Sequence, residues 1–300
     1  MPIRKLGLGL IKKFKFLPDE FYMKVYYEYY TGKKLDLENP EEFNAKIQWL
    51  KIYYRPPILN QLVDKYAVRQ YVEEKIGAEY LNTFIALYDR ASEVDFDALP
   101  DAFVLKATHG YHFNLIVPDK SKLDRKRARY LLRKWQMKNQ YWRGGKEWAY
   151  KDVPARFLAE EYLNELGKID ITDYKYFCFN GEPRFVQIDQ DRATDHRRAF
   201  CDLQGNRLEV EGAGYKPIEG DLYLPPNFEK MAELARTLAN RFPFVRVDFY
   251  NLNGRILFGE MTFYPGDGRL EFAPDHFNKE IGSYMQLPQV PEGQKYITEH

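Results

Sequence analysis

The chain of 300 residues carries 45 Lys and Arg side chains against 44 Asp and Glu, so its formal net charge is +1 and nucleic acid is not an expected partner. With 45% hydrophobic residues it can bury a sizeable core, which excludes disordered and collagen-like classes. No apolar run is long enough to span a bilayer and no secretory leader pattern is present, so we expect a cytoplasmic protein.

Residues 1–38 begin with a basic amphipathic segment. Residues 1–18 contain five basic side chains and no acid, interleaved with leucine, isoleucine and phenylalanine. The pattern favours a helix whose apolar face packs on the rest of the protein. It is also typical of a helix that lies on a membrane, which would place the protein at the inner face of the membrane. The sequence leaves both interpretations open.

Helices are expected over residues 39–80. Asn39 can cap a helix, Pro40 suits its first turn, and Glu42 stands three residues after the cap. A second helix is predicted over residues 62–76, ended by Gly77 in the left-handed conformation.

Residues 81–158 are expected to combine a buried strand with a basic helix. Residues 102–107 form a short apolar run of the buried-strand kind. A helix is predicted after Ser121, with Asp124 completing a capping box. Between Lys120 and Lys146, eleven basic side chains stand against one acid, which is typical of a solvated helix face and would also attract anionic ligands.

Strands dominate the rest of the chain. Asn180-Gly181 and Gln204-Gly205 each predict a hairpin turn, and Asn227 predicts the start of a helix. Helices precede strands rather than alternating with them, so we predict an α+β fold. The predicted strands are 156–163, 174–179, 182–188, 198–203, 206–210, 244–250 and 255–263.

Asp189 and Asp191 form a D-x-D pair at the end of a predicted strand. Such a pair can hold a divalent ion against a nucleotide sugar, which is the chemistry of a glycosyltransferase. The chain has no P-loop, zincin, nucleophile-elbow or kinase motif, so those classes lose their support.

The most informative stretch is a predicted hairpin with charged residues among apolar ones. Strand alternation places Arg246 and Asp248 on one face, and Glu260 and Thr262 share a face of the next strand. Such charges are expensive to bury unless something pairs with them. Two carboxylates offer the hard oxygen ligands that Mg²⁺ takes beside substrate phosphates. An ion pair between Arg246 and a carboxylate is the alternative.

The register of this hairpin decides whether the two acids can act together. They share a face only if the connection has an odd number of residues or a bulge restores the parity. We therefore predict either a three-residue loop over 252–254, with Gly254 left-handed and Arg246 opposite Glu260, or a bulge. An unbulged two-residue turn would separate the acids.

The order R-x-D, hairpin, G-E-x-[NT] and Pro-Gly resembles the metal-binding core of the ATP-grasp ligases. The chain as a whole resembles their TupA-like branch, which is associated with bacterial cell-surface polysaccharide synthesis. The motifs that carry the resemblance are NPEEFNAKIQWL at 39–50, DKYAVR at 64–69, FVLK at 103–106, AEEYL at 159–163, DYKYFCFNGEP at 173–183 and FVRVD at 244–248.

The resemblance implies an ATP-grasp fold in which a small lobe (residues 81–158) and a large lobe (residues 159–300) clasp ATP. Lys106 and Arg69 would bind the phosphates. Mg²⁺ would be held by Asp248, Glu260 and Thr262, while Arg246 would neutralise an acyl-phosphate oxyanion. The other residues assigned to ATP are Glu160, Glu161, Tyr162 and Leu163 around the adenine, Asp173 at the ribose, and Lys175.

The chain departs from the family pattern at two places. The loop at 108–114 has a single glycine where the family's loop is glycine-rich, so its closure over the phosphates is expected to differ. Thr262 stands where many ATP-grasp enzymes have Asn, and a hydroxyl is a poorer metal ligand than an amide oxygen.

An acceptor site is predicted beside the D-x-D pair. Arg192, Arg197 and Arg198 are cations suited to a carboxylate or phosphate, and His196 can serve as general base for an incoming amine.

These features together predict an ATP-dependent carboxylate–amine ligase. Its substrates would be a saccharide carboxylate, such as that of a uronic acid, and an amine. The alternatives are a glycosyltransferase that uses Asp189 and Asp191, and a non-catalytic ATP-grasp scaffold that contacts the membrane through residues 1–18.

Overall fold

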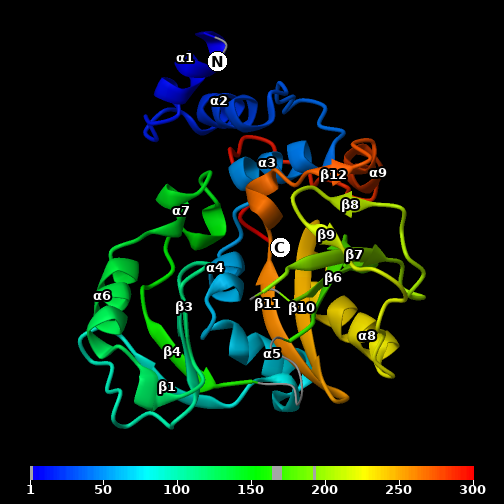
Figure 1. Ribbon diagram of the computed structural model, residues 1–300. Helices are drawn as coiled ribbons and strands as arrows, with labels where there is room; N and C mark the ends of the chain where they lie inside the picture. The colour runs from blue at the N-terminus through cyan, green and yellow to red at the C-terminus, as the bar shows by residue number, and fades with distance from the viewer. Residues whose placement is uncertain (1–2, 164–170, 192–193) are drawn as a thin grey trace.

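The computed structural model describes residues 3–163, 171–191 and 194–300 (Figure 1). Its helices are α1 (Ile3–Ile11), α2 (Asp19–Thr31), α3 (Phe43–Tyr53), α4 (Ile58–Val63), α5 (Val68–Ile76), α6 (Arg125–Gln136), α7 (Gln140–Arg143), α8 (Phe228–Ala239) and α9 (Phe277–Ser283). Its strands are β1 (Phe84–Tyr88), β2 (Phe103–Ala107), β3 (Asn114–Val117), β4 (Phe157–Glu161), β5 (Asp173–Phe179), β6 (Glu182–Gln190), β7 (Arg197–Cys201), β8 (Glu211–Gly212), β9 (Lys216–Pro217), β10 (Phe244–Leu252), β11 (Arg255–Thr262) and β12 (Phe272–Ala273). Single 3₁₀ turns are η1 (Ala78–Tyr80), η2 (Lys120–Lys122), η3 (Trp148–Tyr150) and η4 (Pro265–Gly268).

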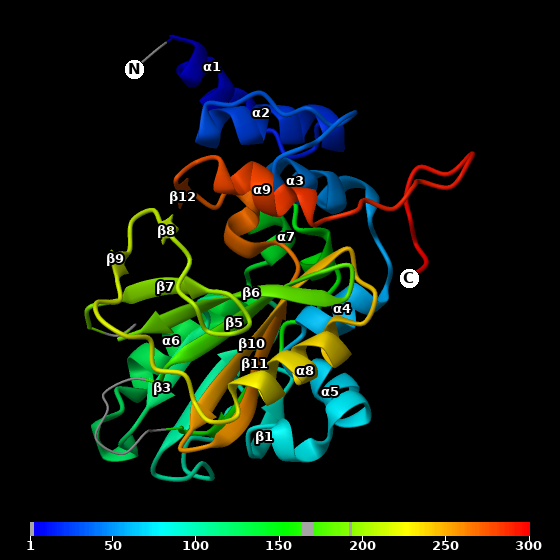
Figure 2. The same cartoon turned by 90° about the vertical axis from the view of Figure 1, so that its right-hand side faces the viewer.

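Two sheets form the centres of two lobes (Figure 1, Figure 2). The four-stranded sheet has the order β1-β4-β2-β3, and α6 packs on it through a shared apolar core. The six-stranded sheet has the order β11-β10-β5-β6-β7-β9, and β7 and β9 are its parallel pair. A short third sheet joins β12 to β8. Because helices and mostly antiparallel strands occupy separate stretches of chain, the α+β prediction is confirmed.

Alternation along β5 decides which face of the six-stranded sheet carries charge. Tyr174 and Tyr176 contact the first residue of α8 on one face. Phe177 packs on α3 on the other face. Asp173 and Lys175 share the face of Phe177 because side chains two residues apart point the same way. A charged surface is thereby left on the sheet beyond the edge of α3.

The first helix of the 39–80 region begins later than predicted. α3 starts at Phe43 rather than at Asn39. The carboxylate of Asp36 accepts hydrogen bonds from the backbone N–H groups of Glu38 and Asn39, at 2.9 and 3.0 Å, and holds this stretch in a turn. The capping function assigned to Asn39 is therefore wrong, because the helix begins four residues after it and no side chain caps its first turn.

The helix predicted over residues 62–76 is two helices, α4 and α5. Asp64 separates them, since its carboxylate accepts from the backbone N–H groups of Tyr66 and Ala67 at 2.8 and 3.1 Å. The α6 helix likewise starts from a carboxylate: Asp124 accepts from the N–H group of Arg127 and is itself the cap. The capping box expected from Ser121 is wrong, because that residue lies in the η2 turn.

The second predicted hairpin forms only in part. β7 ends at Cys201, and a single bridge joins Cys201 to Arg207. The Asp202 carboxylate accepts from the N–H groups of Gln204 and Asn206, so the connection is a side-chain-stabilised loop rather than a tight turn. Residues 206–210 form no regular strand.

The first helix corrects the interpretation favoured by the sequence. α1 lies against α2 but buries none of its residues, and its side chains Ile3, Leu6 and Leu10 are exposed. The side that contacts α2 includes Gly9, which lies against Tyr29, and the half-buried Leu8, and Arg4 adds a 2.6 Å ion pair with Glu28. The expectation that the apolar face packs on the protein is wrong for Ile3, Leu6 and Leu10, whereas Leu8 and Ile11 are half-buried.

The lobes are joined by continuous elements. β4 runs across the boundary expected between residues 158 and 159 and belongs to the four-stranded sheet. Side chains from residues 43–72 share a buried core with the six-stranded sheet. Among the described residues, no helix combines the length and the apolar character that crossing a bilayer requires.

Candidate active site

A small pocket lies where the four-stranded sheet, the α4–α5 connection and β11 meet. The structure brings three residues with predicted roles to this pocket, namely Arg69, Lys106 and Glu160. The complete lining is Lys65, Arg69, Leu81, Asn82, Lys106, Glu160, Phe258 and Gly259.

Glu160 is the centre of one wall of the pocket. Its Oε2 lies 2.7 Å from Lys106 Nζ and its Oε1 lies 2.7 Å from Arg69 Nη1. Strand pairing sets Val104 opposite Glu160, so Lys106, two residues further along β2, shares a face with this carboxylate. Glu160 is buried, with its side chain committed to the two cations.

Lys65 adds a third cation to this wall and was not predicted as a site residue. Its Nζ donates to the carbonyl of Gly110, in the loop that follows β2. Burial, aided by Lys106 and opposed by Glu260, lowers the pKa of Lys65. The Asp64-Lys65 pair at the start of a recognised motif was the available signal. We call Lys65, Arg69, Lys106 and Glu160 the cationic wall.

The predicted adenine segment continues from the end of β4. Glu161 is exposed, and its Oε2 accepts from Thr83 Oγ1 at 2.7 Å while its carbonyl accepts from Asn82 Nδ2 at 2.9 Å. Tyr162 and Leu163 follow as half-buried residues outside the strand.

The β10–β11 hairpin has a two-residue turn and a bulge. Leu252 pairs with Arg255, and the turn residues Asn253 and Gly254 have φ of 51° and 89°. The three-residue loop is therefore wrong. The register shifts after the Asp248–Glu260 pair so that Phe249 faces Phe258, which leaves Gly259 unpaired.

The bulge restores the parity, so this alternative is confirmed. Asp248 pairs with Glu260, and Arg246 lies opposite Thr262 rather than opposite Glu260 as the loop required. A Cβ on Gly259 would lie 3.0 Å from the Asp248 carbonyl oxygen, which is why glycine suits the bulge.

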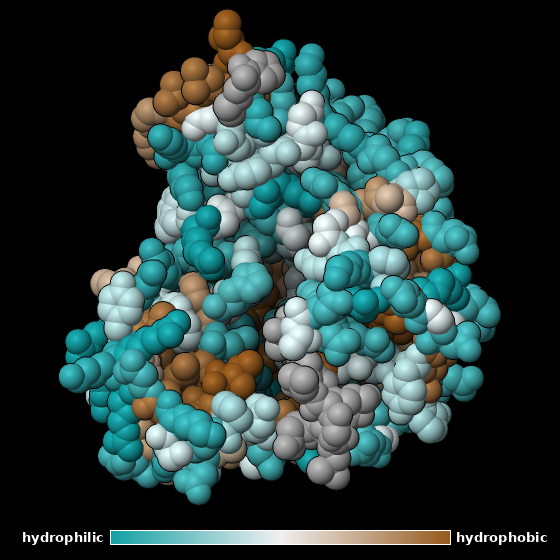
Figure 3. Space-filling view, in the orientation of Figure 1, coloured by the Kyte–Doolittle hydropathy of each residue, from teal (hydrophilic) through white to brown (hydrophobic). Residues whose placement is uncertain are grey.

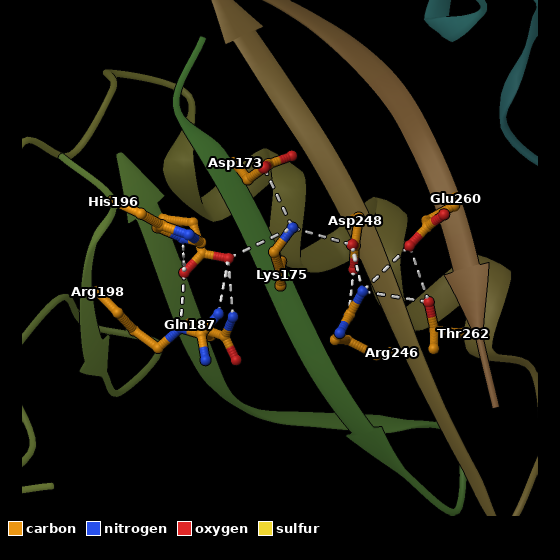
Figure 4. A network of polar contacts seen from close by, with 10 residues as sticks. Asp173, Lys175, Gln187, His196, Arg198, Arg246, Asp248, Glu260 and Thr262 are labelled. Carbon is orange, nitrogen blue, oxygen red and sulfur yellow. Dashed lines mark hydrogen bonds and ion pairs between the residues drawn. The ribbon is translucent and has the colours of Figure 1, made fainter. Parts of the chain in front are cut away.

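Arg246 holds the oxygen atoms of this hairpin together (Figure 4). Its Nε and Nη2 each donate to Asp248 at 2.7 Å, and Nη2 also contacts Glu260 Oε1 and Thr262 Oγ1 at 3.2 Å. Burial raises the pKa of Asp248, opposed by Arg246 and Lys175. Burial opposes the charge of Arg246, but Asp248 and Glu260 outweigh it and raise its pKa.

The donor set fits a hard divalent cation. Oxygens of Asp248, Glu260 and Thr262 converge on one guanidinium nitrogen, and carboxylate and hydroxyl oxygens are the ligands that Mg²⁺ prefers. Within the described part of the chain, no three His, Cys, Asp or Glu side chains gather as a metal site. Two carboxylates suffice where substrate phosphates supply the remaining ligands.

A strip of alternating charge continues across the sheet from this hairpin (Figure 4). Lys175 Nζ lies 3.2 Å from carboxylate oxygens of both Asp173 and Asp248, and 3.7 Å from Asp189. Burial opposes the charge of Lys175, but Asp173 and Asp248 outweigh it and raise its pKa. We call Arg246, Lys175, Asp173, Asp248 and Glu260 the carboxylate wall.

Asp189 ends the strip on β6. Its Oδ1 accepts from Arg198 Nε at 2.7 Å and its Oδ2 accepts from Gln187 Nε2 at 2.9 Å. Burial opposes its charge, yet Lys175 and Arg198 hold the pKa of Asp189 well below its usual range. Since this carboxylate is taken by cations and Asp191 is exposed with φ of 51°, the pair offers no favourable site for a nucleotide-sugar metal.

The predicted acceptor residues divide into two groups. His196 Nε2 lies 3.3 Å from Asp189 Oδ1, and the guanidinium of Arg198 stacks 3.6 Å from the ring centre of Tyr215. Arg197 instead makes ion pairs of 3.0 Å with Asp195 and Glu219 near the surface. Arg192 lies outside the described residues.

Comparison with known proteins decides the family. A sequence model of one family, described as TupA-like ATPgrasp, matches residues 45–286. The chain belongs to the TupA-like ATPgrasp family. Its two α+β lobes, with the pocket where they meet, are the ATP-grasp fold. No curated protein matched the chain.

Solved ATP-grasp structures resemble this TupA-like chain at low identity. D-alanine–D-alanine ligase from Bacillus anthracis, complexed with ATP, is 16% identical over 75% of this chain and 63% of its own, with a TM-score of 0.41. The D-alanine–D-alanine ligase from Helicobacter pylori is 12% identical over 84% of this chain and 68% of its own, with a TM-score of 0.44. The ATP-grasp ligase PsnB, complexed with a minimal precursor, Mg and ADP, is 10% identical over 73% of this chain and 57% of its own, with a TM-score of 0.38. The chain thus spans less than two thirds of the length of the first and third of these structures.

Proposed function

We propose that this protein is an ATP-dependent carboxylate–amine ligase. The observation that carries the proposal is a pocket lined by the cationic wall whose lining residue Gly259 adjoins Glu260 of the oppositely charged carboxylate wall. On the cationic wall Lys106 and Arg69 pair with Glu160 and Lys65 lines the same pocket, whereas three carboxylates surround Arg246 and Lys175 on the carboxylate wall. Triphosphate with a divalent ion complements both walls, since its oxygens need cations and its metal needs carboxylates.

The residues near the pocket have distinct proposed roles. Lys106, Arg69 and Lys65 bind phosphate oxygens through charge-assisted hydrogen bonds. The backbone of residues 160–163 meets the adenine edge, and Asp173 accepts from the ribose hydroxyls. Asp248, Glu260 and Thr262 hold Mg²⁺, which when bound neutralises phosphate charge and polarises the γ-phosphoryl group.

The proposed reaction has two steps. A substrate carboxylate oxygen bonds to the γ-phosphorus of ATP while the bond from that phosphorus to the ADP oxygen breaks, giving an acyl phosphate. Arg246 stabilises the negative charge that develops on the transferred group. An amine then bonds to the acyl carbon and inorganic phosphate leaves.

The amine must lose a proton in the second step. His196 Nδ1 accepts it, and the Asp189 carboxylate, 3.3 Å from the other ring nitrogen Nε2, stabilises the resulting imidazolium. The side chain of His196 is 27% exposed although its Nε2 is buried against Asp189, so an incoming substrate would reach the ring from its Nδ1 side.

The family's association with cell-surface polysaccharide supports a saccharide substrate, such as a uronic acid, joined to an amino acid or amino sugar. Arg198 is the arginine that we retain for binding the acceptor, because it lies beside His196 and Asp189. Arg197 is already paired at the surface.

Calorimetric titration tests the proposal. ATP is titrated into wild-type protein with and without Mg²⁺, and into Glu260→Gln, with the exposed Glu229→Gln as matched control. We expect Mg²⁺ to strengthen ATP binding in the wild type and the control but not in Glu260→Gln. Binding of UDP-sugars with no response to ATP would overturn the ligase and favour the glycosyltransferase.

Turnover separates an enzyme from a scaffold. Wild-type protein with Mg-ATP is incubated with uronic acids and amines, and ADP release is measured. We expect release that needs both co-substrates. Mg-dependent ATP binding without ADP release for any pair would favour the non-catalytic scaffold.

A further inference from the structure

The helix α1 is attached to the protein by polar contacts with α2. Arg4 Nε lies 2.6 Å from Glu28 Oε1, and Lys12 Nζ donates to Tyr30 Oη at 3.0 Å. The Lys12 ammonium also lies 4.3 Å from the ring centre of Tyr29. Gly9 also lies against Tyr29, and Leu8 and Ile11 are half-buried, so one side of α1 faces α2 while Ile3, Leu6 and Leu10 point away from it.

That opposite side is apolar and exposed. Ile3, Leu6 and Leu10 follow one another at the spacing of a single helical stripe, and they are 90%, 59% and 56% exposed. Phe14 and Phe16 continue the stripe at 50% and 79% exposure, with their rings in edge contact. Figure 3 shows the resulting hydrophobic projection at the end of the molecule that bears α1.

An amphipathic helix normally buries its apolar side against its own protein. Here no residue of α1 is buried, although it is held in place by the ion pair and the cation–π contact. Clustered large apolar side chains on a surface mark a site of interaction with another body. We name Ile3, Leu6, Leu10, Phe14 and Phe16 the α1 surface.

Charge indicates what covers the α1 surface. Residues 1–18 hold five basic side chains and no acid, whereas the whole chain has a net charge of only +1. Lys13, which follows α1 in the chain, is exposed, and Lys5 is exposed nearer to α2, over the Tyr29 ring. An apolar stripe flanked by lysine complements a bilayer with anionic headgroups, into which a helix lies in the plane of the interface.

We propose that the α1 surface docks this protein on an anionic lipid membrane. The apolar side chains enter the boundary between headgroups and acyl chains, and the lysines contact lipid phosphates. The helix lies on the membrane rather than crossing it, since Ile3–Ile11 is only nine residues long. The proposal is independent of the ligase chemistry.

Vesicle sedimentation of the full-length protein tests this docking. Vesicles of phosphatidylcholine with about 30% phosphatidylglycerol are compared with phosphatidylcholine alone, and we expect at least about tenfold tighter binding to the anionic vesicles. The double variant Leu6→Glu/Leu10→Glu should lose at least about tenfold in affinity, because charge replaces the inserted stripe. Raising the salt concentration should weaken wild-type binding by screening.

Met137→Glu is the matched control, since Met137 is an apolar side chain with 79% exposure at the end of α6. It should bind vesicles like the wild type. Equal vesicle binding by the double variant and wild type would overturn the proposal, as would an equal loss in Met137→Glu. A wild-type dimer that the double variant converts to monomer, without vesicle binding by either, would also overturn it and assign the α1 surface to a second copy of the chain.

Discussion

The cationic wall and the carboxylate wall use the same device with opposite charge. On the cationic wall one buried carboxylate, Glu160, holds Lys106 and Arg69 in place. On the carboxylate wall the cation Arg246 holds Asp248 and Glu260. Each central group restrains side chains that would otherwise repel one another. The cationic wall keeps an excess of positive charge, and the carboxylate wall keeps an excess of negative charge.

This difference teaches how an unliganded site tolerates concentrated charge. Like charges close together raise the energy of a fold unless they are paired. Glu160 on the cationic wall, and Arg246 with Lys175 on the carboxylate wall, relieve most of the repulsion, and the remaining excess charge is available to a ligand. The cationic wall is thereby suited to phosphate and the carboxylate wall to a metal ion.

The largest expected effect comes from removing the central cation of the carboxylate wall. Arg246→Ala leaves buried Asp248 with Lys175 as its nearest remaining cation, so we expect the free energy of unfolding to fall by about 3 kcal/mol. Urea denaturation measures it. The control is Arg197→Ala, which breaks pairs near the surface and should cause a much smaller loss. Equal losses would contradict the central role of Arg246.

The two walls should differ in their dependence on metal. Lys106→Met removes one charge-assisted contact and should weaken ATP binding about 10–100-fold both with and without Mg²⁺. Glu260→Gln should remove only the increase in ATP affinity that Mg²⁺ provides. Calorimetry measures both, with the exposed Lys126→Met as control. A Lys106→Met effect confined to Mg²⁺-containing samples would break the distinction between the walls.

The far end of the charged strip should show acid-sensitive stability. The pKa of Asp189 is depressed in the folded state, so its contribution is present above its unfolded pKa, near 4, and is lost as the pH falls. Asp189→Asn should therefore lower the free energy of unfolding by about 2 kcal/mol at neutral pH. The difference from the wild type should shrink below about pH 4. Urea denaturation across this pH range tests the direction of the change. A difference in free energy of unfolding that stays constant with pH would contradict the prediction.

The smallest expected effect is a fractional proton uptake at Lys65. Burial lowers the pKa of this lysine, and bound phosphates would raise it, so ATP binding at a pH where free Lys65 is partly neutral should take up less than one proton. Titrations in buffers of different ionisation enthalpy measure this uptake. Lys65→Met should abolish it and Lys126→Met should not. Uptake that survives in Lys65→Met would assign the proton to another group.

Local patterns predicted most of the strands. Asn180 and Gly181 adopt φ of 51° and 86°, as a tight hairpin turn requires, and β5 and β6 flank them as expected. Arg246 and Asp248 were recognisable as site candidates because charges within an apolar strand need partners wherever the strand is placed.

Helix starts were predictable only in part. Ser, Asn and Asp can each accept from nearby backbone N–H groups, so whether Asp36 or Asn39, and Asp124 or Ser121, does so depends on the path of the entire turn. Lys65 escaped prediction because its place in the pocket depends on Gly110, a residue far from it in sequence.

The amino-acid sequence was sufficient for the strand pattern, the family motifs and the chemistry of the hairpin, because alternation, turn propensity and the cost of burying charge act over a few residues. Tertiary structure decided the bulge at Gly259, the separation of Arg197 from Arg198, and the outward direction of the apolar side of α1. Each of these depends on contacts between residues that are far apart in the sequence, and periodicity along the chain carries no information about such contacts.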